Sequence, residues 1–152
     1  MGEVERQARG LLDKTNRQFN ECNALYHTVA QRCGLSDAAF WALYALHVTP
    51  EPLTQNRIAT EWAIPKQTLN SAVAAMAKKG LVELQPGKGA HSGKLLLLTD
   101  AGRTLAEHTV APVIAAEEAA IAAMGLDAAE MFYGLAQKHL EYLRNEFEKI
   151  EL

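Results

Sequence analysis

The sequence predicts a mainly α-helical protein with one small β-hairpin. Apolar residues recur at steps of three and four over long segments near both ends of the chain, as they do in amphipathic helices. Between residues 82 and 98, two short apolar runs instead flank a glycine-rich stretch, which is typical of two strands joined by a turn. With 152 residues, 49% of them hydrophobic, the chain is predicted to form a single domain, residues 1–152, around a substantial core.

The first predicted element is one continuous helix from Val4 to Cys33. Its apolar stripe consists of Val4, Ala8, Leu11, Thr15, Phe19, Cys22, Tyr26, Val29 and Cys33. A helix of this size extends ~45 Å, at 1.5 Å per residue. The central region is too small to cover all of it, so we expect part of the stripe to meet another chain.

Two short helices joined by a tight turn are predicted between Thr54 and Gly80. The apolar positions are Ile58, Ala59 and Trp62 in the first helix, and Leu69, Val73 and Met76 in the second. The pair Ile64 and Pro65 separates the two stripes. We expect Pro65 in the first turn of the second helix, where its missing N–H costs nothing, and Gly80 at the end of that helix.

The outward face of the second helix is suited to a DNA groove. When Leu69, Val73 and Met76 face inward, the outward positions are Gln67, Asn70, Ser71, Ala74 and Lys78. This face is small, rich in amides and free of acidic residues. Amides can pair with base edges in the major groove, although an ordinary solvent-exposed helix face has a similar composition.

A hairpin is predicted directly after these helices. Val82 to Gln85 alternates at period two, and Leu95 to Leu98 is a short apolar run. The tip between them holds the polar side chains of Lys88, His91, Ser92 and Lys94 and no acidic residue. Helix, turn, helix and hairpin in this order predict a winged helix, with glycines that let a phosphate backbone approach the tip.

The segment after the hairpin is predicted to be helical again. Thr99 is expected to cap a helix that begins at Asp100 and is kinked by Pro112, and Asp127 to cap a final helix. The apolar stripe of the final helix consists of Phe132, Leu135, His139, Leu143, Phe147 and Ile150.

Charge is distributed unevenly along the chain. The net charge is −3, yet residues 54–103 contain seven basic and three acidic side chains, a balance of +4 that leaves −7 for the remainder. A basic region on an acidic body would orient the protein on a polyanion, although ordinary charge scatter can produce the same balance.

Other chemistries find little support in the sequence. The Gly87 to Gly93 loop has the wrong spacing for a phosphate-binding loop, and the five histidines and two cysteines lack the spacing of a zinc site. No nucleophile motif is present, so neither an enzyme, a metal nor a cofactor is expected. Without an apolar leader or a membrane span, the protein is expected to be cytoplasmic, with Cys22 and Cys33 as free thiols; oxidant sensing by either thiol is left open.

The chain resembles the MarR family of winged helix-turn-helix transcription regulators over nearly its whole length. The resemblance is carried by Leu35-Ser36 with Phe40, Leu43 and Leu46; by Thr54, Ile58-Ala59, Ile64, Thr68-Leu69, Val73 and Met76; by Lys79-Gly80-Leu81-Val82; and by Leu98-Thr99-Asp100-Ala101-Gly102. One departure concerns the wing, where the family usually has an Asp-Arg pair and this chain has lysines. Lysine lacks the planar fork that suits arginine to a narrow minor groove, so weaker wing contacts are expected.

The resemblance implies a homodimeric transcription regulator, acting as a ligand-responsive repressor on double-stranded DNA with a pseudo-palindromic operator. It implies a winged helix-turn-helix at residues 36–103 and dimerisation helices at 1–33 and 104–152. The candidate DNA-binding residues are Thr54, Gln55, Lys66, Gln67, Thr68, Asn70, Ser71, Lys78, Lys88, His91 and Lys94, with Gln67 and Asn70 as base readers. A small aromatic or lipophilic effector is expected near Tyr26, Trp41 and Tyr44, for which core packing is the alternative interpretation. The alternative function is a winged-helix module that binds proteins and no DNA.

Overall fold

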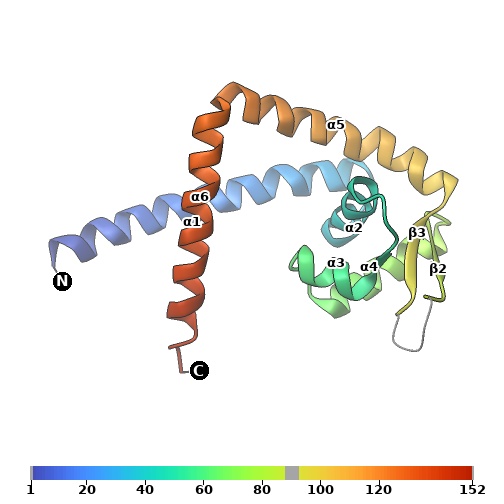
Figure 1. The fold of residues 1–152 in the computed structure, drawn as a ribbon, viewed down its shortest axis with the longest axis horizontal. Helices are drawn as coiled ribbons and strands as arrows, with labels where there is room; N and C mark the ends of the chain where they lie inside the picture. The colour runs from blue at the N-terminus through green and yellow to red at the C-terminus, as the bar shows by residue number, and fades with distance from the viewer. Residues whose placement is uncertain (1, 88–92, 152) are drawn as a thin grey trace. The chain divides into compact units, whose positions relative to one another are not determined.

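The computed structural model describes residues 2–87 and 93–151, and its fold is mainly helical with one small sheet (Figure 1). Its elements are α1 (Glu3–Arg32), α2 (Asp37–Val48), β1 (Leu53–Thr54), α3 (Gln55–Glu61), α4 (Lys66–Lys78), β2 (Val82–Gln85), β3 (Leu95–Leu98), α5 (Asp100–Met124) and α6 (Leu126–Phe147). The predicted fold class, a winged helix-turn-helix with long terminal helices, is confirmed. The chain divides into two compact units, one ending at Ala111 and one beginning at Pro112.

The long first helix is confirmed as α1. At its start, the Gly2 N–H donates to Oε2 of Glu5 at 2.7 Å, which satisfies one of the free donors of a helix N-terminus. At its end, Gly34 adopts φ +66°, a left-handed conformation that favours glycine, and the Leu35 N–H returns to the Ala30 carbonyl at 2.9 Å. The sequence therefore specifies where α1 stops.

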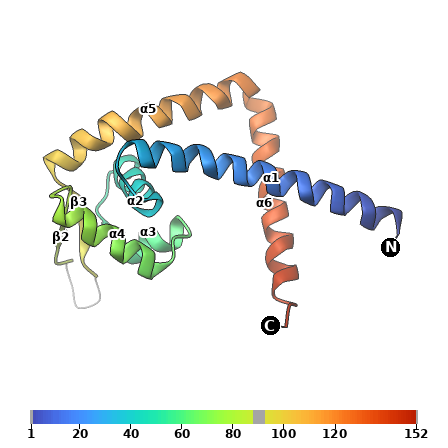
Figure 2. The ribbon, with the colours of Figure 1, turned by 180° about the vertical axis from the view of Figure 1, so that it is seen from behind.

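The core of the first unit lies among α2, α3, α4 and the sheet. Its largest fully buried side chains are Phe40, Leu43, Leu53, Ile58, Leu69, Val73, Met76, Leu96 and Val110. The inward positions predicted for the two short helices are among them, except that Ala59 keeps 7% exposure and Trp62 is half-buried. In both Figure 1 and Figure 2, α4 lies beside the hairpin, and α3 packs against α4 and β1. The hairpin is thus packed onto the second helix of the pair.

The sheet has three antiparallel strands in the order β1-β3-β2, one more than the sequence predicts. The predicted hairpin is present, with Val82 opposite Leu98 and Gln85 opposite Leu95. The additional strand β1 places Leu53 opposite Leu96. Two residues are too short for an alternating pattern, so period-two analysis could not find β1.

The last two helices begin differently from one another. Thr99 caps α5 as predicted, because its Oγ1 accepts the Gly102 N–H at 3.0 Å, and Pro112 lies inside that helix. The predicted cap Asp127 is wrong, since the residue before α6 is Gly125 with φ +85°. Gly125 both ends α5 and starts α6, so Asp127 falls inside the first turn, where its negative charge still favours the positive helix end.

Large apolar side chains remain exposed on α1 and α6. On α1 they include Leu11 and Phe19, which are 64% and 65% exposed, and on α6 they include Leu135 and Phe147, which are 60% and 65% exposed. These residues belong to the two apolar stripes recognised in the sequence. Contiguous apolar surface of this kind commonly marks a protein interface.

Candidate nucleic-acid interface

The first helix of the helix-turn-helix is fixed by Thr54. Its Oγ1 accepts the Arg57 N–H at 3.2 Å, which makes Thr54 the N-cap of α3, and Gln55 is the first residue of that helix. Both predicted phosphate contacts are half-buried. Thr54 therefore has a structural role in addition to its predicted contact with DNA.

The turn between α3 and α4 is held by backbone geometry. The Ile64 N–H donates to the Ala59 carbonyl at 3.0 Å, and Ala63 adopts φ +50° in the left-handed region. Pro65 has ψ +131° and is the N-cap, so the prediction that it lies within the first turn of α4 is wrong by one position. Its carbonyl accepts the Leu69 N–H at 3.0 Å and so opens the helix at Lys66.

α4 separates its residues into a buried and an exposed face. Leu69, Ala72, Val73 and Met76 are buried. The exposed residues include the six candidate DNA contacts on this helix, Lys66, Gln67, Thr68, Asn70, Ser71 and Lys78, and also Ala74. The structure thus brings these candidates together on one surface without acidic residues. The hydroxyl of Ser71 donates to the Gln67 carbonyl at 3.1 Å, which leaves its oxygen as an acceptor.

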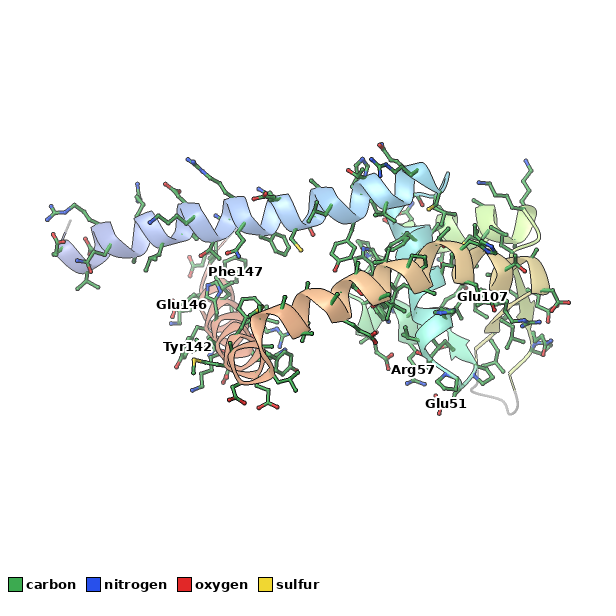
Figure 3. All side chains as sticks on the ribbon, turned by 90° about the horizontal axis from the view of Figure 1, so that it is seen from above. Glu51, Arg57, Glu107, Tyr142, Glu146 and Phe147 are labelled. Carbon is green, nitrogen blue, oxygen red and sulfur yellow. The ribbon has the colours of Figure 1, made fainter. Side chains whose placement is uncertain are left out.

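The basic charge near the helix-turn-helix is partly neutralised. Nε of Arg57 lies 2.6 Å from a carboxylate oxygen of Glu61, and that pair raises the pKa of Arg57. Glu51, labelled with Arg57 in Figure 3, makes a smaller contribution in the same direction. Arg103 is paired with Asp100. Among the described residues, Lys66, Lys78 and Lys94 are exposed and make no ion pair. These three lysines are among the charges available to phosphates.

The wing is described only at its base. Lys94 is exposed immediately before β3. The other two predicted wing contacts, Lys88 and His91, lie outside the described residues.

The three predicted effector residues form part of one aromatic cluster. The Trp41 ring centroid lies 4.7 Å from that of Tyr26, 5.5 Å from that of Tyr44 and 5.6 Å from that of Trp62. Phe40, fully buried, contacts both Trp41 and Tyr44. The cluster therefore joins α1, α2 and the end of α3, and four of its five rings are half-buried.

A side-chain hydrogen bond lies next to this cluster in sequence. Nδ1 of His27, on α1, is 2.8 Å from Oδ1 of Asp37 at the start of α2. Both side chains are about half exposed, so the pair contributes less than about 1 kcal/mol to stability. It adds a polar link between the same two helices that the aromatic rings join.

A cavity of about 350 Å³ lies elsewhere in the first unit, between the end of α2 and the start of α5. Its lining includes Leu46, His47 and Leu96, together with Glu51 and Glu107, which Figure 3 labels. None of the three predicted effector residues lines it. Arg103 also lines this cavity, so its wall carries charges of both signs.

The described part of the chain shows neither a metal-binding cluster nor a single membrane-spanning helix. Within residues 2–87 and 93–151, no group of three or more His, Cys, Asp or Glu side chains is arranged to hold a metal ion. Over the same residues no helix alone is long and apolar enough to cross a membrane, and only α5 and α6 together, across their break, have the required length and composition. Cys22 and Cys33 are free thiols.

Comparison with known proteins agrees with this architecture. Residues 34–91 match the family model described as the MarR family, whereas none of the curated proteins compared with the chain matched it. A MarR family regulator from Neisseria meningitidis is 25% identical, with 91% of this chain and 97% of that chain covered and a TM-score of 0.77.

Two other solved structures share the fold at lower identity. One, a putative MarR family regulator from Listeria monocytogenes complexed with a 26mer DNA, is 16% identical, with 89% of each chain covered and a TM-score of 0.71. The other, Staphylococcus aureus MarR in complex with salicylate and kanamycin, is 18% identical, with 95% of this chain and 97% of that chain covered and a TM-score of 0.68.

Proposed function

We propose that this chain, whose residues 34–91 match the model of the MarR family, is a winged helix-turn-helix regulator of that family, and that it is a homodimeric repressor that binds DNA and is released by a small ligand. The observation that carries the proposal is the exposed face of α4, which includes Gln67 and Asn70 and contains no acidic residue. Bidentate amide contacts to adenine in the major groove are worth ~1–3 kcal/mol of discrimination. The Listeria relative, solved with a 26mer DNA, supports the same use of the fold.

The roles of the candidate residues follow from their chemistry. Gln67 and Asn70 read base edges, whereas Lys66, Lys78 and Lys94 hold phosphates as point charges. The acceptor oxygen of Ser71 suits a base amino group better than a phosphate, because its proton is directed at the Gln67 carbonyl. In a two-fold dimer, the two α4 helices address half-sites ~34 Å apart, one turn of the duplex.

The first test is selection of bound duplexes from genomic fragments, followed by a salt titration with the selected site. If each dimer contacts six phosphates, a plot of log affinity against log salt concentration should have a slope near −5, because each neutralised phosphate contributes about −0.9. A slope near zero, with no selected site, would overturn DNA binding. It would favour the alternative function, a winged helix that binds proteins. The pairing of Arg57 and Arg103 with acidic residues supports that alternative, because it reduces the positive charge available to DNA.

Point variants separate base reading from phosphate binding. Gln67→Ala is expected to weaken the selected site by ~1–3 kcal/mol while leaving random duplexes unchanged, because only base contacts carry sequence information. Lys66→Ala is expected to weaken both duplexes alike and to flatten the salt slope by ~1 for each phosphate that is no longer neutralised. Gln137→Ala, an exposed glutamine on α6, is the matched control and should change neither.

We further propose that the effector is a small aromatic or lipophilic acid held at the aromatic cluster. The half-buried rings of Tyr26, Trp41 and Tyr44 supply apolar contact area. The Staphylococcus relative was solved with salicylate, which supports this ligand class. The only two tryptophans of the chain, Trp41 and Trp62, both belong to the cluster, so their fluorescence reports on it directly.

The effector is tested by titrating salicylate while recording tryptophan fluorescence and operator affinity. Saturable quenching together with weaker operator binding is expected, since a ligand shifts an equilibrium by its preference for one state. Tyr26→Ala should weaken both effects in parallel. Release of DNA without any change in fluorescence would place the effector at another site.

A further inference from the structure

The end of the recognition helix α4 is fastened to the start of α5 by one side chain. Oγ1 of Thr99 donates to the Gly80 carbonyl at 2.6 Å and accepts the Gly102 N–H at 3.0 Å. The Thr99 N–H donates to the Leu81 carbonyl at 3.1 Å. Thr99 therefore caps α5 and at the same time holds Gly80 and Leu81, the two residues that follow the C-cap of α4.

The same contact is reinforced where two backbones touch. A Cβ atom placed on Gly102 would lie 1.9 Å from the Leu81 oxygen, a distance that no real side chain shows. Gly102 is buried, and Figures 1 and 2 both place the first turn of α5 beside the beginning of β2, which follows α4. The first turn of α5 cannot slide along this segment without breaking the Thr99 bonds.

A second connection leads from the same place to α1. Nζ of Lys79 donates to the Gly34 carbonyl at 3.2 Å, and Gly34 is the left-handed residue that ends α1. A cation at the carbonyl end of a helix is favoured by the orientation of the peptide dipoles. Lys79, Gly80 and Leu81 are consecutive, so three neighbouring residues tie α4 to both α1 and α5. We call these three residues the α4 junction.

We propose that the α4 junction, held by Thr99, sets the position of the recognition helix relative to α1 and α5 and thereby the half-site spacing that the protein accepts. This inference rests on the proposed function, in which α1 and α5 continue into the dimer interface. One base pair added between the half-sites increases their separation by ~3.4 Å and rotates one half-site relative to the other by roughly a tenth of a turn. A rigid junction cannot follow that change, whereas a loosened junction can.

The spacing profile of the selected operator tests the proposal. Affinity is measured with the native spacer and with spacers one base pair shorter and longer. The wild type is expected to lose on the order of tenfold at either altered spacer, because the duplex must be deformed to fit. Thr99→Val keeps the shape of the side chain but lacks both hydrogen bonds of the hydroxyl group. The factor by which this variant loses affinity at altered spacers should therefore be at least threefold smaller than that of the wild type. Thr99→Ser retains the hydroxyl and should restore the wild-type profile.

Two adjacent lysines provide a matched pair should Thr99→Val fold poorly. Lys79→Met removes the bond to Gly34 and is expected to flatten the spacing profile. Lys78→Met removes the same charge one residue away, at an exposed position without an ion pair, and should weaken binding equally at every spacer. If Lys79→Met and Lys78→Met give the same profile, the connection to α1 has no positioning role.

A measurement without DNA separates this inference from the proposed function. Spin labels are attached at Ala74→Cys on α4 and Glu107→Cys on α5, in a protein whose two native cysteines are replaced by serine. Labelled protein is diluted with unlabelled protein, so that the measured distance is the one between the two labels of a single protomer. Thr99→Val should broaden the distance distribution, and Thr99→Ser should not. Broadening in a protein that binds no duplex refutes only the DNA-binding function. An unchanged distribution together with an unchanged spacing profile in a folded Thr99→Val refutes the junction.

Discussion

At the scale of single residues, the turn of the helix-turn-helix contains a backbone conformation that its side chain disfavours. Ala63 adopts φ +50°, where the Cβ of an L-residue is crowded and costs roughly 1–2 kcal/mol. Glycine adopts this conformation freely but loses roughly 0.5–1 kcal/mol more in chain entropy on folding. The balance between these two effects decides what replacement would do.

Ala63→Gly is expected to raise the free energy of unfolding by about 0.5 kcal/mol, the difference between relieved crowding and added entropy. Ala74→Gly, at an exposed position within α4, should instead lower it by about 1 kcal/mol, the usual cost of glycine in a helix. Urea unfolding of the two variants measures both. Equal losses in the two would show that Ala63 is unstrained.

Gly102 is the residue whose lack of a side chain matters most to the packing of α5. Gly102→Ala is expected to destabilise the protein by about 3 kcal/mol, at the upper end for overpacking, because the obstacle is the backbone oxygen of Leu81 and not a flexible side chain. Gly134→Ala, in α6, meets no atom within 4 Å and should be neutral or stabilising by up to about 1 kcal/mol. Thermal unfolding compares them, and similar midpoints would refute the close approach.

At the scale of elements, β3 is the central strand of the small sheet and supplies one of its two fully buried side chains. Leu96 is fully buried between Leu53 and Leu84, its partners in the two neighbouring strands. Leu84 itself is 40% exposed. Leu84 and Leu96 face each other across one strand pair, yet they differ greatly in how much apolar surface they remove from water.

Leu96→Ala is expected to cost about 2–5 kcal/mol of stability through lost burial and the cavity it leaves. Leu84→Ala should cost about 1 kcal/mol or less, because much of its side chain is already hydrated. Denaturant midpoints at equal slope give the comparison. A larger loss for Leu84→Ala than for Leu96→Ala would contradict the register described for β2 and β3.

The elements that the sequence predicts correctly have a clear local pattern. α1 and α4 follow from helical spacing, and the hairpin follows from two short apolar runs that flank a glycine-rich stretch. The predicted cap at Asp127 is wrong because a glycine with positive φ two residues earlier opens α6 first. β1 escapes detection because its position depends on pairing with β3, which lies far away in the chain.

The candidate site is predictable to a similar extent. The exposure of Gln67 and Asn70 follows from the helical period and is confirmed, and their contact with DNA stays a prediction. The bond from Lys79 to Gly34 spans 45 residues, so no local pattern could reveal it. The pairing of Arg57 with Glu61 at the next helical turn is readable from spacing and reduces the basic charge that a simple count suggests.

At the scale of the whole molecule, the exposed apolar faces of α1 and α6 predict association of two chains. The molecular mass measured by light scattering is expected to be twice the protomer mass of 16.6 kDa. Leu135→Lys, within the α6 stripe, should shift the protein toward the protomer because it buries a charge in the interface. Gln137→Lys, on another side of the same helix, should leave the mass unchanged. A protomer mass for the wild type would overturn the dimer.

The order of strands in the sheet also bears on how the chain avoids aggregation during its synthesis. Leu95–Leu98 is an uncharged leucine segment of the kind that joins foreign strand edges when it is left unpaired. It is the last strand to leave the ribosome but the middle one in space, so both of its neighbours are already present when it emerges. The newly made leucine segment can therefore pair with β1 and β2 as soon as it emerges, which shortens the time during which it could aggregate with other nascent chains.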